Sequence, residues 1–67
     1  MAIVKVIEIM ANSKKSWDDA TQQAVAHASK SLRNIRSVNV NNMSCTVDKK
    51  GKIAEYRVNC SISFEVE

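Results

Sequence analysis

The sequence of 67 residues has no proline, one glycine, two cysteines, one histidine and three aromatic residues. Without proline and with a single glycine it has no segment of linker composition, so one domain over residues 1–67 is expected. The cysteines and His27 are too few for a structural zinc site, which takes four ligands. The sequence shows no nucleophile with an adjacent base and no paired carboxylates at a plausible site, so it predicts a protein that is not an enzyme.

A long hydrophobic run is also missing. The segment "AIVKVIEIMA" is interrupted by Lys5 and Glu8 and is too short to span a bilayer. No signal peptide is recognisable, so we expect a soluble cytoplasmic protein without a membrane partner. The net charge of +3 fits an anionic partner or an ordinary surface. No strand carries an aromatic pair for bases, and no GxxG loop occurs, so nucleic acid is not expected as a partner.

The small size of the chain predicts a partner of its own kind. A domain this short buries about 60% of the surface that its unfolded chain exposes, which leaves little stability from its own core. Such domains are usually reinforced by disulfides, a metal or association of subunits. Because the first two are not favoured here, the sequence predicts a homo-oligomer.

Residues 2–11 have the alternation of a strand that is apolar on both faces. Ile3, Ile7 and Ile9 share one face, whereas Val4, Val6 and Met10 share the other. A strand with two apolar faces needs cover on both sides. One helix can cover only one of them, so a partner subunit is expected on the other.

Residues 17 to about 34 have helical spacing. Apolar residues recur every three or four positions at Trp17, Ala20, Ala24, Ala28, Leu32 and Ile35. Ser16 is a favourable N-cap, and Asp19 is placed to reach back to it as in a capping box.

Residues 38–48 and 52–66 are predicted as two strands joined by the turn "DKKGK", with Gly51 in the left-handed conformation. If Asp48 pairs with Lys52, Val40 lies opposite Cys60, Val38 lies opposite Ile62, and Cys45 lies opposite Glu55. The two cysteines then point to different faces and lie several residues apart along the ladder. This arrangement excludes a disulfide between them.

The predicted fold is α+β, in the order strand, helix, strand, strand. A right-handed crossover makes the second strand parallel to the first, and the third strand returns antiparallel between them. The three-stranded sheet then has one helix packed on one face and a bare polar face on the other. The bare face is expected to carry Ser37, Arg57, Asn59, Ser61 and Ser63.

Several segments resemble the dodecin family. They are the strand "VKVIEI", the loop end "SWDDA", the segment "SLRNIR" and the closing strand "YRVNCSISFEVE", and the resemblance covers residues 2–67. It implies a hollow homododecamer that stores flavins such as FMN or riboflavin, with ligand sites between subunits.

The resemblance also implies two cofactor-binding positions, which differ in this chain. Flavin-binding dodecins carry a tryptophan directly after the "LRN-hydrophobic-basic" segment, and its indole stacks on the flavin. Here that residue is Ser37, which has no surface for stacking. A glutamine in the last strand of the family matches Arg57, which can grip a phosphate or stack on a ring. The chain looks closer to a branch that lacks this tryptophan, has a similar "YR", and has been associated with metal ions.

Two interpretations therefore remain open. One is a dodecin-like storage protein that binds a flavin or a related anionic ligand at Ser37 and Arg57. The other is a dodecin-like shell that does not stack flavin and instead binds metal ions such as calcium or acts as a scaffold. Asp48, Glu55 and Glu65 could supply the oxygen ligands that Ca²⁺ prefers, but their spacing matches no calcium loop, so the sequence assigns no metal site.

Overall fold

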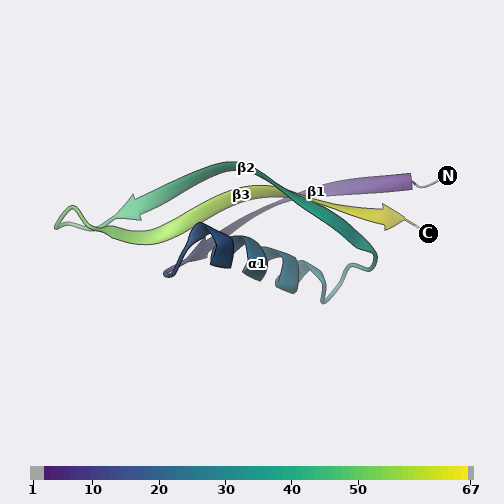
Figure 1. The fold of residues 1–67 in the computed structure, drawn as a ribbon, viewed down its shortest axis with the longest axis horizontal. Coiled ribbons are helices and arrows are strands. Elements are labelled where there is room, and N and C mark those ends of the chain that lie inside the picture. The colour runs from purple at the N-terminus through teal and green to yellow at the C-terminus, as the bar shows by residue number, and fades with distance from the viewer. Residues whose placement is uncertain (1–2, 67) are drawn as a thin grey trace.

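The computed structural model describes residues 3–66, and its elements follow the predicted order. They are β1 (Ile3–Ser13), α1 (Trp17–Ala28), β2 (Ile35–Val47) and β3 (Ile53–Val66). Figure 1 shows a long twisted sheet with α1 lying along one of its faces. Ala2, where the first strand was expected to begin, lies outside the described residues. Within residues 3–66, no helix is long and apolar enough to cross a membrane.

The strand order is β1-β3-β2, with both outer strands antiparallel to β3, as predicted. The central place of β3 follows from its strict alternation. Val58, Cys60 and Ile62 point toward the helix side and are fully buried. The described chain is 52 Å long and 20 Å wide, so a helix of 12 residues covers only the middle of the sheet.

Small side chains bring the helix close to the sheet. Ala20, Ala24 and Ala28 are the buried residues of α1, and the first two pack against Val58 and Cys60. Alanine loses no side-chain entropy in a helix and lets a helix approach its neighbour closely. The resulting core contains few large side chains, which agrees with the thin stability expected for a chain of this length.

The helix is shorter than predicted, since it ends at Ala28 rather than near Asn34. Beyond Ala28 the backbone tightens, with the Lys30 amide donating to the His27 carbonyl at 3.2 Å. Asn34 then takes a left-handed conformation with φ of 60°, which turns the chain into β2. The apolar spacing that includes Ile35 indicated a longer helix, but Ile35 belongs to β2, where it lies opposite Phe64.

The predicted register between β2 and β3 is correct at one end and wrong at the other. Val40 lies opposite Cys60 and Val38 opposite Ile62, as expected. Cys45, however, lies opposite Tyr56 instead of Glu55, because a bulge between Val40 and Asn42 shifts the ladder by one residue. Cys45 therefore faces the helix side, the same side as Cys60.

Both cysteines are nevertheless free. Tyr56, the partner of Cys45, lies four residues from Cys60 along β3, which corresponds to about 13 Å of strand. That separation is far beyond the reach of a disulfide. The expectation of two unpaired cysteines is confirmed, although for a different arrangement of side chains.

The predicted hairpin turn is confirmed. Gly51 has φ of 81°, and the Asp48 amide donates to the Lys52 carbonyl at 2.8 Å. The Asp48 carboxylate accepts hydrogen bonds from the backbone amides of Lys50 and Lys52, at 2.9 and 3.0 Å. The Asp48 carboxylate therefore stabilises the turn.

The loop before α1 contains a small hydrogen-bonded cluster. Ser16 caps the helix as predicted, its hydroxyl accepting from the Asp19 amide at 2.9 Å. The Asp19 carboxylate does not complete a capping box but accepts from Ser13 Oγ and Gln23 Nε2, both at 2.6 Å. These bonds, together with the charge of Lys15, hold the pKa of Asp19 below its ordinary value against a smaller opposing effect of desolvation.

This cluster predicts a specific loss of stability in acid. Because the bonds favour the ionised carboxylate, their stabilisation is complete above the unfolded-state pKa, about 4, and is lost as the pH falls through the lower folded-state pKa. We expect Asp19→Asn to lower the thermal midpoint at pH 7 and to change it much less at pH 3. Asp18→Asn is the matched control, because Asp18 is exposed. An equal loss at both pH values would contradict this account.

Candidate ligand-binding face

The sheet has one face without a helix, which we call the open face. Figure 1 shows α1 on the opposite side. Along β3 the open face carries the residues that alternate with the buried ones, and partner positions on β2 extend it. Its members on these two strands are Ser37, Asn39, Asn42, Ser44, Thr46, Glu55, Arg57, Asn59, Ser61, Ser63 and Glu65. Every one of these side chains is polar or charged, as the sequence predicted for this face.

Hydroxyl and amide side chains of the open face form hydrogen bonds with one another. The hydroxyls of Ser37 and Ser63 are hydrogen-bonded to each other. Asn41 Nδ2 donates to Ser61 Oγ at 2.8 Å, and Asn39 Nδ2 donates to Asn41 Oδ1 at 2.9 Å. Asn41 faces this side because it follows Ser37 and Asn39 in the alternation of β2, and the bulge brings Asn42 to the same side, opposite Asn59. The network presents an ordered row of uncharged oxygen and nitrogen atoms.

Arg57 lies elsewhere on the same face. Its Nε donates to Asn12 Oδ1 at 3.0 Å, and Asn12 Nδ2 in turn contacts Glu55 Oε1 at 3.4 Å. Asn12 thus orients the guanidinium from the end of β1. The two terminal nitrogens of Arg57 form no hydrogen bond with residues 3–66, so they are available to an anion.

One chain does not bring the two sequence-predicted site residues together. Ser37 lies opposite Ser63, whereas Arg57 lies six residues farther back along β3. Six residues of strand span about 20 Å, more than the reach of both side chains. A single small group such as a phosphate cannot contact both Ser37 and Arg57 of one chain.

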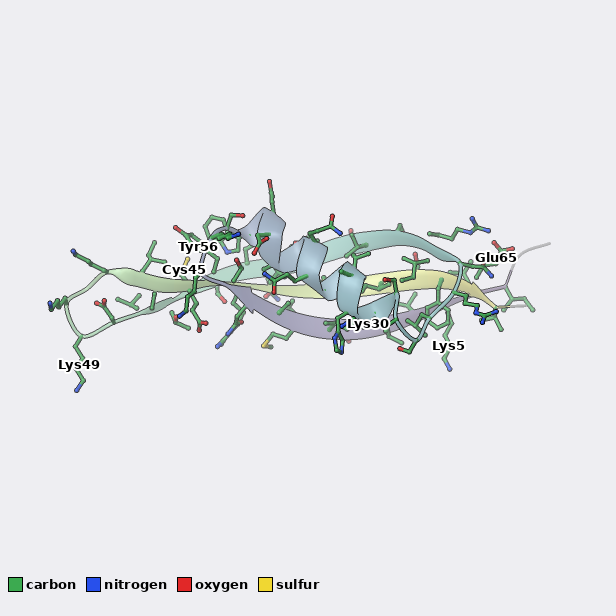
Figure 2. All side chains as sticks on the ribbon, turned by 90° about the horizontal axis from the view of Figure 1, so that it is seen from below. Lys5, Lys30, Cys45, Lys49, Tyr56 and Glu65 are labelled. Atoms are coloured by element: carbon green, nitrogen blue, oxygen red, sulfur yellow. The ribbon has the colours of Figure 1, made fainter. Side chains whose placement is uncertain are left out.

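All three aromatic side chains lie on the helix side of the sheet. Trp17 Nε1 donates to the Ser44 carbonyl at 3.0 Å, and its ring meets Tyr56 edge to face with centroids 5.1 Å apart. Trp17 is therefore a packing residue, which also contacts the core cluster under the helix. Phe64 alternates with the open-face residues of β3 and shares the side of Tyr56, which Figure 2 shows next to Cys45. The open face therefore offers no ring on which a flat ligand could stack.

The three candidate oxygen ligands are scattered. Asp48 holds the hairpin turn, Glu55 contacts Asn12, and Glu65 forms an ion pair with Arg36 near the other end of the sheet. Figure 2 shows Lys49, at the turn, and Glu65 at opposite ends of the chain. Within residues 3–66, no group of three or more histidine, cysteine or acidic residues could hold a metal ion. A cation site built from these carboxylates requires a second copy.

Sequence reasoning missed the amide side chains of this face. Asn12 was placed beyond the expected end of the first strand, yet it holds Arg57. Asn39 and Asn41 were predicted only as members of the strand over residues 38–48. The alternation of β2 could have identified both Asn39 and Asn41, whereas Asn42 joins them opposite Asn59 only because of the bulge, which no sequence pattern indicated.

Comparison with known proteins gives consistent matches. The family model described as Dodecin matches residues 3–67. The calcium dodecin of Mycobacterium tuberculosis is 38% identical over 66 residues, covering 98% of this chain and 92% of that protein.

Solved structures show the same architecture. A Thermus thermophilus dodecin superimposes with a TM-score of 0.92 at 28% identity, covering 100% of this chain and 98% of that one. The dodecin of Streptomyces coelicolor gives 0.92 at 26% identity, covering 98% and 93%. The M. tuberculosis calcium dodecin, described as calcium-chelating and solved with a calcium-binding site, gives 0.84 at 37% identity, covering 97% and 91%.

Proposed function

This chain belongs to the dodecin family, and on that premise we propose that it is a binding protein rather than an enzyme. In this proposal, identical copies close into a hollow homo-oligomer, a dodecamer as the family resemblance implies. Small ligands are held at the seams between copies, without stacking of a flavin. The observation that carries the proposal is the open face, which is rich in oxygen donors and devoid of aromatic rings.

Exposed apolar surface supports the self-association. The large hydrophobic residues left exposed by one chain are Ile3, Val4, Val6, Met10, Val40, Met43, Val47, Ile53 and Val66. They lie on both faces of the sheet and at both of its ends. Burial of such side chains contributes about 1.5–3 kcal/mol each. Copies of the chain provide the cover that a single helix cannot.

Calcium is the ligand we propose first. The open face presents carboxylate, amide and hydroxyl oxygens, the donor types that Ca²⁺ selects. A relative at 38% identity is a calcium dodecin. Of the three candidate carboxylates, Glu55 is held least firmly, since its only hydrogen bond among the described residues is the 3.4 Å contact with Asn12. Glu55 is therefore the carboxylate we propose as a ligand from one copy.

The test is equilibrium dialysis of the full chain against Ca²⁺, with the bound ion measured by elemental analysis. We expect a stoichiometric ion in the native protein and at least a tenfold weaker affinity in Glu55→Gln, because the amide removes a charged ligand. Asp18→Asn, on the exposed helix surface, is the matched control and should bind as the native protein does. Native protein without any stoichiometric ion would overturn the calcium proposal. The remaining interpretation would then be an oligomeric shell that acts as a scaffold.

An anionic ligand is the second candidate, and Arg57 favours it. Its guanidinium is oriented through Nε by Asn12, while the terminal nitrogens point to no partner among residues 3–66. This is the arrangement that binds a phosphate group in two-pronged fashion. Ser37 of another copy, with its hydroxyl, would complete such a site. Comparing the affinities for FMN and riboflavin tests this candidate, because the two differ by a phosphate.

A further inference from the structure

The β2–β3 hairpin extends beyond the rest of the domain. The β1 ladder stops at Ser13 opposite Tyr56, whereas β2 continues along β3 as far as Val47 opposite Ile53. We call residues 46–54 the hairpin arm; Figure 1 shows it reaching past α1 and β1. Two strands alone are marginally stable in water, so an arm of this kind benefits from a surface to rest on.

The hairpin arm is apolar along one side and basic at its tip. Val47 and Ile53 face each other across the ladder and are 62% and 54% exposed. The tip carries three basic residues, Lys49, Lys50 and Lys52, and one acidic residue, Asp48. The Asp48 carboxylate accepts hydrogen bonds from backbone amides of the turn. No element of the same chain reaches this patch, because α1 and β1 both end short of it.

A second exposed apolar surface lies on β1, on the open face of the sheet. Val4, Val6 and Met10 are 52%, 55% and 62% exposed there, opposite open-face residues of β3. We call these residues, with Glu8 between them, the β1 strip. Glu8 is the only charged member of the strip, and its sign is opposite to that of the arm tip.

From this complementarity we propose that the hairpin arm of one copy packs on the β1 strip of a second copy. The inference rests on the proposed self-association. In one chain the two surfaces lie apart along the sheet, because Ile53 is six residues, about 20 Å of strand, from Asn59, the partner of Met10. A chain therefore cannot make the contact with itself. Each copy then gives one arm and receives another, and such contacts close into a pair or a ring of copies.

Two variants test the contact by particle mass in analytical ultracentrifugation. The arm variant, Val47→Asp with Ile53→Asp, places acidic groups on the hairpin arm, where Glu8 of the second copy repels them. The strip variant, Val6→Lys, places a basic group on the β1 strip, where the lysines of the arm tip repel it. Each variant alone should give a smaller particle than the native chain. Mixed together they should give a larger particle than either alone, because the intact arm of one fits the intact strip of the other. Gln22→Asp on the exposed helix surface should keep the native mass.

The outcomes separate this inference from the proposed function. A native chain that sediments as a single folded copy overturns the self-association itself. A native oligomer whose arm variant or strip variant keeps its full mass overturns only the arm-to-strip contact, as does a mixture that remains at the size of its components.

A second measurement serves if the charged variants unfold. In a Cys45→Ser background, a chain carrying both Val6→Cys and Val47→Cys should form disulfides between copies, whereas either substitution alone should not. Equal cross-linking by a single substitution would indicate a symmetric contact and overturn the proposal, and so would the absence of cross-links in the double variant.

Discussion

A Ser37→Trp variant is expected to bind FMN and quench its fluorescence, whereas the native chain leaves FMN fluorescence unchanged. The substitution replaces the hydroxyl that bonds to Ser63 with an indole on the open face, where Ser37 is exposed. An aromatic pair contributes about 0.5–1.5 kcal/mol beyond the area it buries, which corresponds to roughly a twofold to tenfold gain from stacking alone. Burial of the ring adds to this gain.

The matched control is Ser37→Leu, which adds apolar bulk without a ring. Fluorescence titrations should show binding by the tryptophan variant only; equal affinities for the two variants, or quenching by the native chain, would contradict the assignment. FMN and riboflavin differ by a phosphate, so the same variant also reports on Arg57. If the guanidinium holds the phosphate, Ser37→Trp should bind FMN more tightly than riboflavin. The Ser37→Trp, Arg57→Gln double variant should bind the two flavins equally.

Ile62→Ala is expected to give the largest loss of stability among single core substitutions. Ile62 is fully buried and lies between Ile7 of β1 and Val38 of β2. Removing a buried isoleucine side chain to alanine costs about 2–5 kcal/mol. A chain of 67 residues has a stability on the order of 3–10 kcal/mol, so the variant should lose a large fraction of its stability and unfold at a much lower urea concentration.

Ile3→Ala makes the same chemical change at a position that is 67% exposed in one chain. Urea unfolding at a dilution where copies separate should show a change of about 0.5 kcal/mol or less for this control. If Ile3→Ala were as damaging as Ile62→Ala under those conditions, burial within one chain would not explain the stability of the fold.

Strand alternation and the crossover rule were enough to predict the order of elements and the central place of β3. The strict period of two in residues 53–66 identifies a strand with one buried face, and the right-handed crossover then leaves one arrangement of the three strands. The bare polar face follows directly, which is why Ser37 and Arg57 were placed on it correctly.

Local backbone irregularities could not be predicted in the same way. The bulge near Asn41 and the left-handed Asn34 depend on how the strands twist against each other, and that is decided by packing rather than by any one residue. They changed the side of Cys45 and the end of the helix. The separation of Ser37 from Arg57 along the sheet follows from the predicted register alone, whereas the contacts between copies that the proposed site uses cannot be predicted from one chain.

The order β1-β3-β2 also has a consequence during synthesis on the ribosome. Both outer strands pair only with β3, and Ile3 finds its partner at Val66. Neither β1 nor β2 has a hydrogen-bonding neighbour until the final strand has emerged, so the nascent chain exposes two unpaired, proline-free strands throughout elongation. Such long-range closure slows folding and invites aggregation.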